Sequence, residues 1–197
     1  DKADIYAKDI HFSESKTSFE VYRKNKNKKI SVELNLPGIH NIQNALAAIA
    51  VATELDIDDK SIIEAFKNFS GINRRFQVTK NITVKDGKIT LIDDYGHHPT
   101  EILATINAIK SGWGSKRITL LFQPHRYTRT RELFSEFVEV LSKVDQLILT
   151  EVYAAGEEKI DNISGQSIIE DIKNKSSKKP IFVRSLKESV DVINRTV

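Results

Sequence analysis

The stretch Ile118–Arg129 (ITLLFQPHRYTR) decides the fold class, because it changes from apolar to polar within a few residues. Its first part is a short, continuous apolar run, which is typical of a strand buried on both faces of a sheet. The polar part that follows holds an imidazole and two guanidinium groups, and it leads into a helix predicted over residues 129–143. A buried strand, a polar loop and a helix in this order indicate an α/β fold.

The same order recurs along the second part of the chain. Further apolar runs stand at residues 89–92, 147–149 and 181–183. Each is followed by an amphipathic pattern, which predicts helices at residues 99–110, 164–173 and 186–194. We therefore expect a Rossmann-like, mostly parallel sheet with helices on both faces over residues 73–197.

The first part of the chain has a different rhythm. Apolar and polar side chains alternate at residues 5–10, 17–22 and 30–36, which predicts strands buried on one face. Pro37-Gly38 ends this pattern, and helices are predicted at residues 41–55 and 60–68. We expect these strands and helices to form a separate domain, residues 1–72, with the boundary near residues 71–77.

Composition excludes several classes of protein. The 197 residues include 30 basic and 27 acidic side chains, and the net charge of +3 is too dispersed to indicate a nucleic-acid partner. Cysteine is absent, which excludes disulfide frameworks, thiolate zinc sites and cysteine nucleophiles. No apolar run is long enough to cross a membrane, and the start at Asp1 does not look like a signal peptide.

One dense basic run, Arg23–Lys29, lies between two predicted strands. We interpret it as the solvated tip of a hairpin, with a patch for nucleic acid or lipid as the alternative.

Polar residues follow three successive apolar runs, at the strand ends where open α/β sheets bind ligands. After Ile92, residues 93–98 include two carboxylates and two imidazoles. Adjacent loop residues rarely converge on one ion, so we favour a hydrogen bond from a ribose to Asp94 over a metal site. The alternative is that Asp94 and Thr100 tie down the loop and cap the next helix.

The loop after Phe122 carries Arg126 and Arg129, three residues apart at a predicted helix start. Two cations at a helix N-terminus oppose the helix dipole, which makes sense if they bind an anion. The alternative is pairing with Glu132 or Glu136 on the same helix. A third polar loop, Thr150–Glu157, follows the next apolar run.

Two further segments have a functional and a structural interpretation. Asn41 and Asn44 stand at a predicted helix start, where an amide suits either an adenine edge or an N-cap. Arg75 lies at the expected domain boundary, where it would reach a phosphate or form a surface ion pair.

Five segments in order resemble the motifs of the Mur ligases: Leu36–Ala48, Gly71–Gln77, Asp93–Glu101, Phe122–Thr130 and Val152–Glu157. The first resembles the PGxHNxxNALAA segment of that family, and the last three look like its alanine-adding members. The resemblance implies that residues 1–72 are the end of a central ATPase domain. Residues 73–197 would be most of the C-terminal Rossmann-like domain.

The resemblance also implies a reaction and a set of residues. ATP phosphorylates the carboxylate of UDP-N-acetylmuramate, and the amine of L-alanine attacks the acyl phosphate. The residues implied for ATP are His40, Asn41, Asn44, Arg75 and Asp94. Those implied for L-alanine are Tyr95, His97, Arg126 and Arg129. The two arginines would bind the alanine carboxylate and, with His97, carry catalysis.

The sequence departs from the family in lacking a GxxxxGK[ST] phosphate loop. The resemblance implies that this loop, most Mg²⁺ ligands and the UDP-binding domain lie outside the sequence, so we expect the chain alone to be an inactive fragment. It also implies a bacterial cytoplasmic protein without a membrane partner. A murein-peptide recycling ligase and a non-catalytic nucleotide-binding module are the alternatives.

Overall fold

The computed structural model describes residues 3–24, 26, 28–85 and 87–196. The described residues fall into two compact units. We call the first unit the residues up to Val78 together with Ile92–Tyr95 and Ala104–Lys116. The second unit holds Thr79–Leu91, Gly96–Leu103 and the residues from Arg117 onward.

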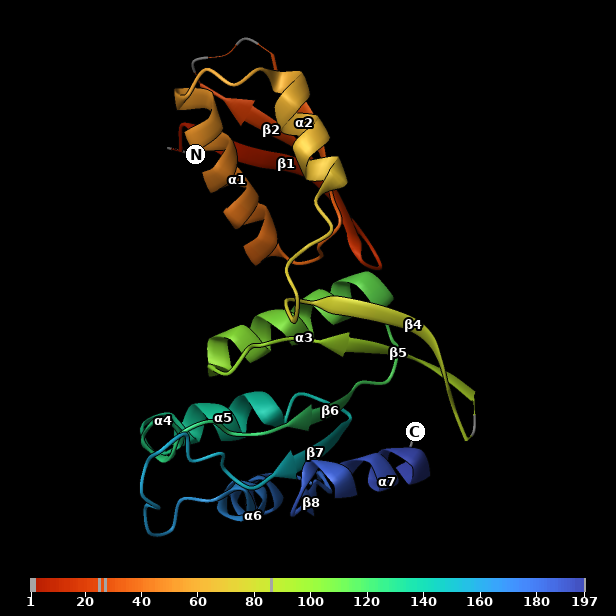
Figure 1. Ribbon diagram of the computed structural model, residues 1–197, viewed down its shortest axis with the longest axis vertical. Helices are drawn as coiled ribbons and strands as arrows, with labels where there is room; N and C mark the ends of the chain where they lie inside the picture. Colours follow the sequence, from red (N-terminus) through yellow and green to blue (C-terminus); the bar gives the residue numbers. More distant parts are fainter. Residues whose placement is uncertain (1–2, 25, 27, 86, 197) are drawn as a thin grey trace. The chain divides into compact units, whose positions relative to one another are not determined.

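The first unit contains a three-stranded antiparallel sheet made of β1 (Ile5–Ser13), β2 (Lys16–Arg23) and β3 (Ile30–Leu34). One face of this sheet is covered by α1 (Ile39–Glu54) and α2 (Asp59–Asn68), as Figure 1 shows. The predicted strands and helices of this part of the chain are therefore confirmed.

Strand periodicity explains what the sheet buries. Every second residue of β2 points into the core, and β3 follows the same rule. The resulting apolar cluster holds side chains of the sheet and both helices, among them Phe19, Val21, Ile30, Val32, Ile42, Ile49 and Ile62. The same alternation along β2 continues to Arg23, so this side chain also points into the core and is only 5% exposed.

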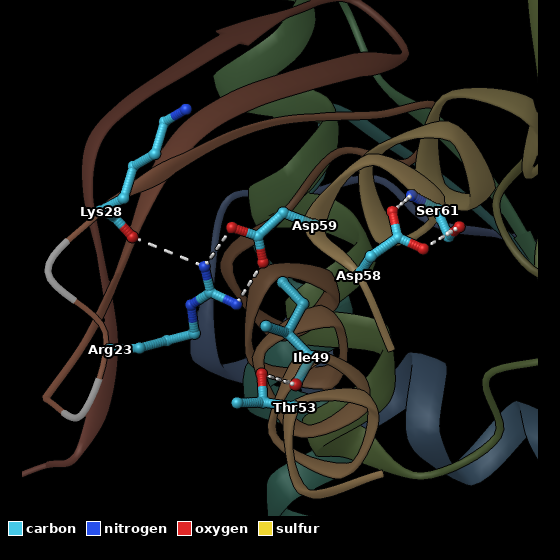
Figure 2. A network of polar contacts seen from close by, with 7 residues as sticks. All are labelled: Arg23, Lys28, Ile49, Thr53, Asp58, Asp59 and Ser61. Atoms are coloured by element: carbon cyan, nitrogen blue, oxygen red, sulfur yellow. Dashed lines mark hydrogen bonds and ion pairs between the residues drawn. The ribbon is translucent and has the colours of Figure 1, made fainter. Parts of the chain in front are cut away.

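Arg23 corrects the interpretation of the basic run as a solvated tip. Its guanidinium donates two hydrogen bonds to Asp59, Nη1 to Oδ1 at 2.7 Å and Nη2 to Oδ2 at 2.9 Å (Figure 2). Lys24 pairs instead with Asp4 at the surface, and Lys29 with Glu20. Asn25 and Asn27 of the run lie outside the described residues.

Polar groups fix the ends of α2. Asp58 caps its N-terminus by accepting hydrogen bonds from the backbone N–H of Ser61 at 2.9 Å and from its hydroxyl at 2.6 Å (Figure 2). At the other end, the Asn35 amide donates to the carbonyls of Lys67 and Phe69. These bonds satisfy backbone groups that a helix cannot pair internally.

The second unit contains a parallel three-stranded sheet of β6 (Thr119–Phe122), β7 (Gln146–Thr150) and β8 (Ile181–Val183). Its helices are α4 (Tyr127–Glu132), α5 (Phe134–Leu141), α6 (Gly165–Lys175) and α7 (Leu186–Thr196). The predicted fold class, a mixed α/β fold with a parallel sheet, is confirmed.

Two expectations for the elements differ from the structure. The apolar run at 89–92 belongs to β5 (Gly87–Asp93), which pairs with β4 (Gln77–Val84) in a separate two-stranded sheet. No residue of β5 is buried, whereas four of the five in β7 are, so an apolar run alone does not identify a central strand. The helix expected at 129–143 begins at Tyr127 and is interrupted at Leu133.

The remaining helix, α3 (Pro99–Trp113), follows β5. None of the helices in the described part of the chain is both long and apolar enough to cross a membrane.

Candidate functional site

The loops after β6 and β7 are joined by backbone hydrogen bonds beyond the ends of their strands. The N–H of Arg126 donates to the carbonyl of Tyr153 at 2.8 Å, and the N–H of Tyr153 donates to the carbonyl of Pro124 at 2.8 Å. His125 and Tyr153 thereby form an isolated parallel bridge. The polar residues predicted to meet at the strand ends are brought together here by the backbone itself.

Arg126 has an unusual backbone conformation, with φ 73° and ψ 134°. This region of φ/ψ space is unfavourable for a residue with a Cβ atom and costs about 1–3 kcal/mol. The buried Thr130 helps to hold it, because its hydroxyl donates to the Arg126 carbonyl at 2.8 Å. Strain that is held by surrounding hydrogen bonds is frequent at functional sites.

Arg126 offers a test of this strain. Glycine has no Cβ penalty at positive φ, so Arg126→Gly is expected to be more stable than Arg126→Ala by about 1–2 kcal/mol. The measurement is the urea midpoint of the two variants, followed by circular dichroism. Arg131 lies within helix α4, so there the order should reverse, with Arg131→Gly less stable than Arg131→Ala by about 1 kcal/mol. If the alanine variant were the more stable one at both positions, the inferred strain at Arg126 would be wrong.

A carboxylate from the β7 loop lies at the start of α4. Glu157 accepts hydrogen bonds from the Thr128 backbone N–H at 3.0 Å and from its hydroxyl at 2.7 Å. These bonds, and more weakly the charge of Arg126, lower the pKa of Glu157. The nearest approach of Arg126 Nη1 to Glu157 Oε1 is 4.0 Å, so this ion pair is loose.

His125 lies near several polar side chains of the second unit. Its ring centroid is 6.3 Å from that of His97 and 5.3 Å from that of Tyr153. The Arg129 guanidinium donates to the His125 carbonyl at 3.1 Å. Burial first, and then the charges of Arg129 and Arg126, lower the pKa of His125 below its ordinary value of 6.5.

His97 is held by the helix that follows it. Its backbone N–H and that of His98 both donate to Glu101 Oε2, at 3.0 and 3.1 Å, in the manner of a capping box. The same carboxylate oxygen lies 3.7 Å from Nδ1 of the His97 ring. Glu101 therefore fixes the backbone of His97, and its carboxylate lies near the ring.

Three of the four residues predicted for the amino acid lie together in the second unit: His97, Arg126 and Arg129 surround His125. Tyr95 belongs to the first unit, where its N–H donates to the Arg74 carbonyl at 2.7 Å. Its ring lies under the guanidinium groups of Arg74 and Arg75, at 5.3 and 5.5 Å.

The residues predicted for the nucleotide all belong to the first unit. Asp94 faces His40 closely enough to raise the pKa of that imidazole, but burial outweighs this effect and the net shift is downward. Asp94 Oδ2 also accepts the Phe76 N–H at 2.9 Å. Asp94 thus fixes the backbone at Phe76, outside its own loop, and its ribose contact remains a prediction.

The two asparagines of α1 differ in their surroundings. The N-cap of α1 is Gly38, so Asn41 lies in the first turn of the helix. The interpretation of Asn41 as the N-cap is therefore wrong. Its amide donates to the Pro37 carbonyl at 2.7 Å. Asn44 is exposed on the same helix.

His40 predicts a specific pH dependence of stability. A lowered histidine pKa means that the unfolded chain binds more protons, so stability is complete above pH 6.5 and declines as the pH falls through the folded pKa. His40→Gln should make the urea midpoint of the first unit, read by Trp113 fluorescence, less sensitive to acid. The same change at the exposed His11 should leave the dependence as in the wild type.

Three residues of the site were not among those predicted: His125, Tyr153 and Glu157. The signal for them was their position in the polar loops after two neighbouring strands. Among the described residues, no group of three or more histidine or acidic side chains is arranged to hold a metal ion.

Comparison with known proteins shows which family the chain belongs to. The model of the Mur ligase glutamate ligase domain matches residues 74–196, and that of the Mur ligase middle domain matches residues 1–52. The chain belongs to the Mur ligase family. As a Mur ligase, it has its predicted amino-acid residues Arg126 and Arg129 in the segment that matches the glutamate ligase domain.

Several solved Mur ligases and relatives share this fold. The UDP-N-acetylmuramate-alanine ligase MurC from Thermotoga maritima is 30% identical, with a TM-score of 0.78 over 97% of this chain and 40% of its own. MurF from Acinetobacter baumannii is 17% identical, with a TM-score of 0.70 over 98% of this chain and 38% of its own. A folylpolyglutamate synthase from Thermotoga maritima is 18% identical, with a TM-score of 0.64, over 95% of this chain and 41% of its own. This Mur ligase chain thus spans less than half the length of these proteins.

Proposed function

We propose that this chain carries the amino-acid site and part of the nucleotide site of an ATP-dependent ligase that joins UDP-N-acetylmuramate to L-alanine. Mur ligases form amide bonds, and the finer choice of alanine is supported by the 30% identity to a protein named for that reaction. The observation that carries the proposal is the pair Arg126 and Arg129 beside His125. Burial, and then the charges of these arginines, lower the pKa of that imidazole.

The arginine pair suits a carboxylate ligand. Arg126 is 52% exposed at its side chain and 4.0 Å from Glu157, so its guanidinium retains donors for another anion. Arg129 uses one donor on a backbone carbonyl and has no carboxylate partner among the described residues. Guanidinium groups bind carboxylates through paired hydrogen bonds, and a free amino acid offers such a carboxylate.

The other residues take roles from their surroundings. His97 lies beside His125, and Tyr95, which belongs to the first unit, would bind the amino acid as the family motif implies. His40, Asn44, Arg75 and Asp94 would hold the nucleotide, with Asn41 supporting the turn that bears His40. When bound, ATP supplies the phosphoryl group that activates the sugar carboxylate. The arginines would bind the carboxylate of alanine and so orient its amine for attack.

The proposal places the protein in the bacterial cytoplasm. Magnesium would accompany ATP. The described residues include no cluster of ligands for a metal ion, so we assign magnesium neither ligands nor a reaction step in this chain.

A ligation assay with the full-length natural protein tests this function. The assay supplies ATP and UDP-N-acetylmuramate and compares free L-alanine with the tripeptide that a recycling ligase would accept. We expect phosphate release and product with L-alanine and neither with the tripeptide. Product with the tripeptide in its place would assign the protein to peptide recycling, and nucleotide binding without any product would leave only a binding module.

A further inference from the structure

The ring of His125 has an unusual set of neighbours. The rings of His97 and Tyr153 both lie near it, and its own backbone carbonyl accepts a hydrogen bond from Arg129. Neither ring nitrogen of His125 makes a hydrogen bond with any residue that the structure describes. The residue is only partly buried, and neither ring nitrogen is a fully buried atom without a partner.

Amide formation needs a proton acceptor close to the arginines. An amino acid near neutral pH carries an ammonium group, whose nitrogen has no lone pair for attack on a carbonyl carbon. The ammonium nitrogen is attached to the carbon next to the carboxylate. If Arg126 and Arg129 bind the carboxylate, the ammonium group of the same ligand therefore lies close to both guanidinium groups.

We infer that His125 is the catalytic base that removes a proton from the ammonium group of the incoming amino acid. This inference rests on the proposed ligation of a free amino acid. His125 precedes Arg126 in the chain, and its carbonyl binds Arg129, so a ligand held by both arginines lies against this residue. General bases act from hydrogen-bond distance, which this placement allows.

The charges around His125 keep it able to accept a proton. The groups that face it are His97, Arg126, Arg129 and Glu157, and only Glu157 favours the protonated ring. Burial and the two arginines dominate, so the imidazole is neutral at neutral pH.

The step balances in atoms and charge. One N–H bond of the ammonium breaks, its proton moves to a ring nitrogen of His125, and the freed lone pair forms the C–N bond at the acyl phosphate carbon. The tetrahedral intermediate then expels phosphate as the C–O bond breaks, and a second proton leaves the nitrogen with the phosphate. His125 returns its proton to solvent.

The test separates this proton transfer from every earlier step by changing the nucleophile. Hydroxylamine is neutral near neutral pH, so it attacks an acyl phosphate without a base and yields a hydroxamate. In the full-length natural protein, His125→Gln should lower kcat with L-alanine by about 100-fold and leave hydroxamate formation unchanged. His11→Gln, the same change at an exposed position, should alter neither rate.

Each outcome has a definite meaning. Equal loss of both products in His125→Gln and His125→Asn, with native circular dichroism, would overturn the inference and give His125 a role before amine attack. Full activity with L-alanine would also overturn it. If wild-type protein forms hydroxamate but no alanine product, the proposed substrate is wrong, and with no product from either nucleophile the proposed ligation itself fails.

The wild-type protein gives a second measurement without any variant. kcat/KM for L-alanine should decline in acid as His125 becomes protonated, with a midpoint below pH 6.5, the ordinary value for histidine. The hydroxylamine reaction should lack this decline. A shared decline would assign the titrating group to another step.

Discussion

Replacing Asp59 with alanine is expected to lower the free energy of unfolding of the first unit by about 3 kcal/mol. The Arg23 side chain is 3% exposed, and its two terminal nitrogens donate to Asp59. Its Nε has no partner, so the pair with Asp59 is what compensates the buried charge. Without Asp59, the guanidinium remains buried with only a weak bond of 3.5 Å to the Lys28 carbonyl.

Removing the other partner should cost much less. The Asp59 side chain is 39% exposed, so water can solvate it once Arg23 is gone. Arg23→Met keeps an apolar stem in the core, and we expect a loss of about 1 kcal/mol or less. The order of the two variants follows from the unequal burial of the partners, and a reversed order would contradict it.

Urea titrations followed by Trp113 fluorescence measure both variants, because this single tryptophan lies in the first unit. The surface pair Lys16–Glu33 is the control, and Glu33→Ala should cost less than about 1 kcal/mol. Hydrogen bonding by Arg23 lowers the pKa of Asp59. The stability from this pair is therefore present above the ordinary aspartate value of 3.8 and is lost as the pH falls through the lowered pKa.

Arg126→Ala is expected to raise the KM for L-alanine by about 30-fold in the full-length natural protein, because a bond to a charged partner contributes about 1.5–3 kcal/mol. The KM for ATP should stay unchanged, since the nucleotide residues belong to the first unit. Steady-state phosphate release at varied alanine and ATP concentrations measures both constants.

Two variants make this result specific. Arg126→Lys keeps the charge but not the fork of donors, so it should recover only part of the alanine affinity. Arg117→Ala removes an exposed arginine of the same unit and should leave both constants unchanged. An unaltered alanine KM in Arg126→Ala would show that this arginine serves the backbone of its loop and not the substrate.

Periodicity along the chain was enough to predict most of the fold. The apolar alternation of β2 and β3 and the continuous run of β7 indicate which side chains are buried. It failed for β5, whose apolar run resembles a central strand although none of its residues is buried. Burial depends on which strands become neighbours, and a single strand does not contain that information.

The site was predictable in its residue types and less so in its contacts. Arg126 and Arg129 were identified as a cation pair, but their relation to His125 and Glu157 depends on the pairing of two loops. Arg23 was missed because the strand was ended one residue early. Extending the alternation of β2 by one step would have placed it on the buried face.

The bridge between His125 and Tyr153 has a consequence for the thermodynamics of binding. A loop that becomes ordered only around its ligand loses conformational entropy at that moment, and the affinity falls accordingly. Here the two loops are already paired through the backbone, so that entropy is lost during folding. The site is preorganised, and a ligand as small as an amino acid, which forms few contacts, gains most from this.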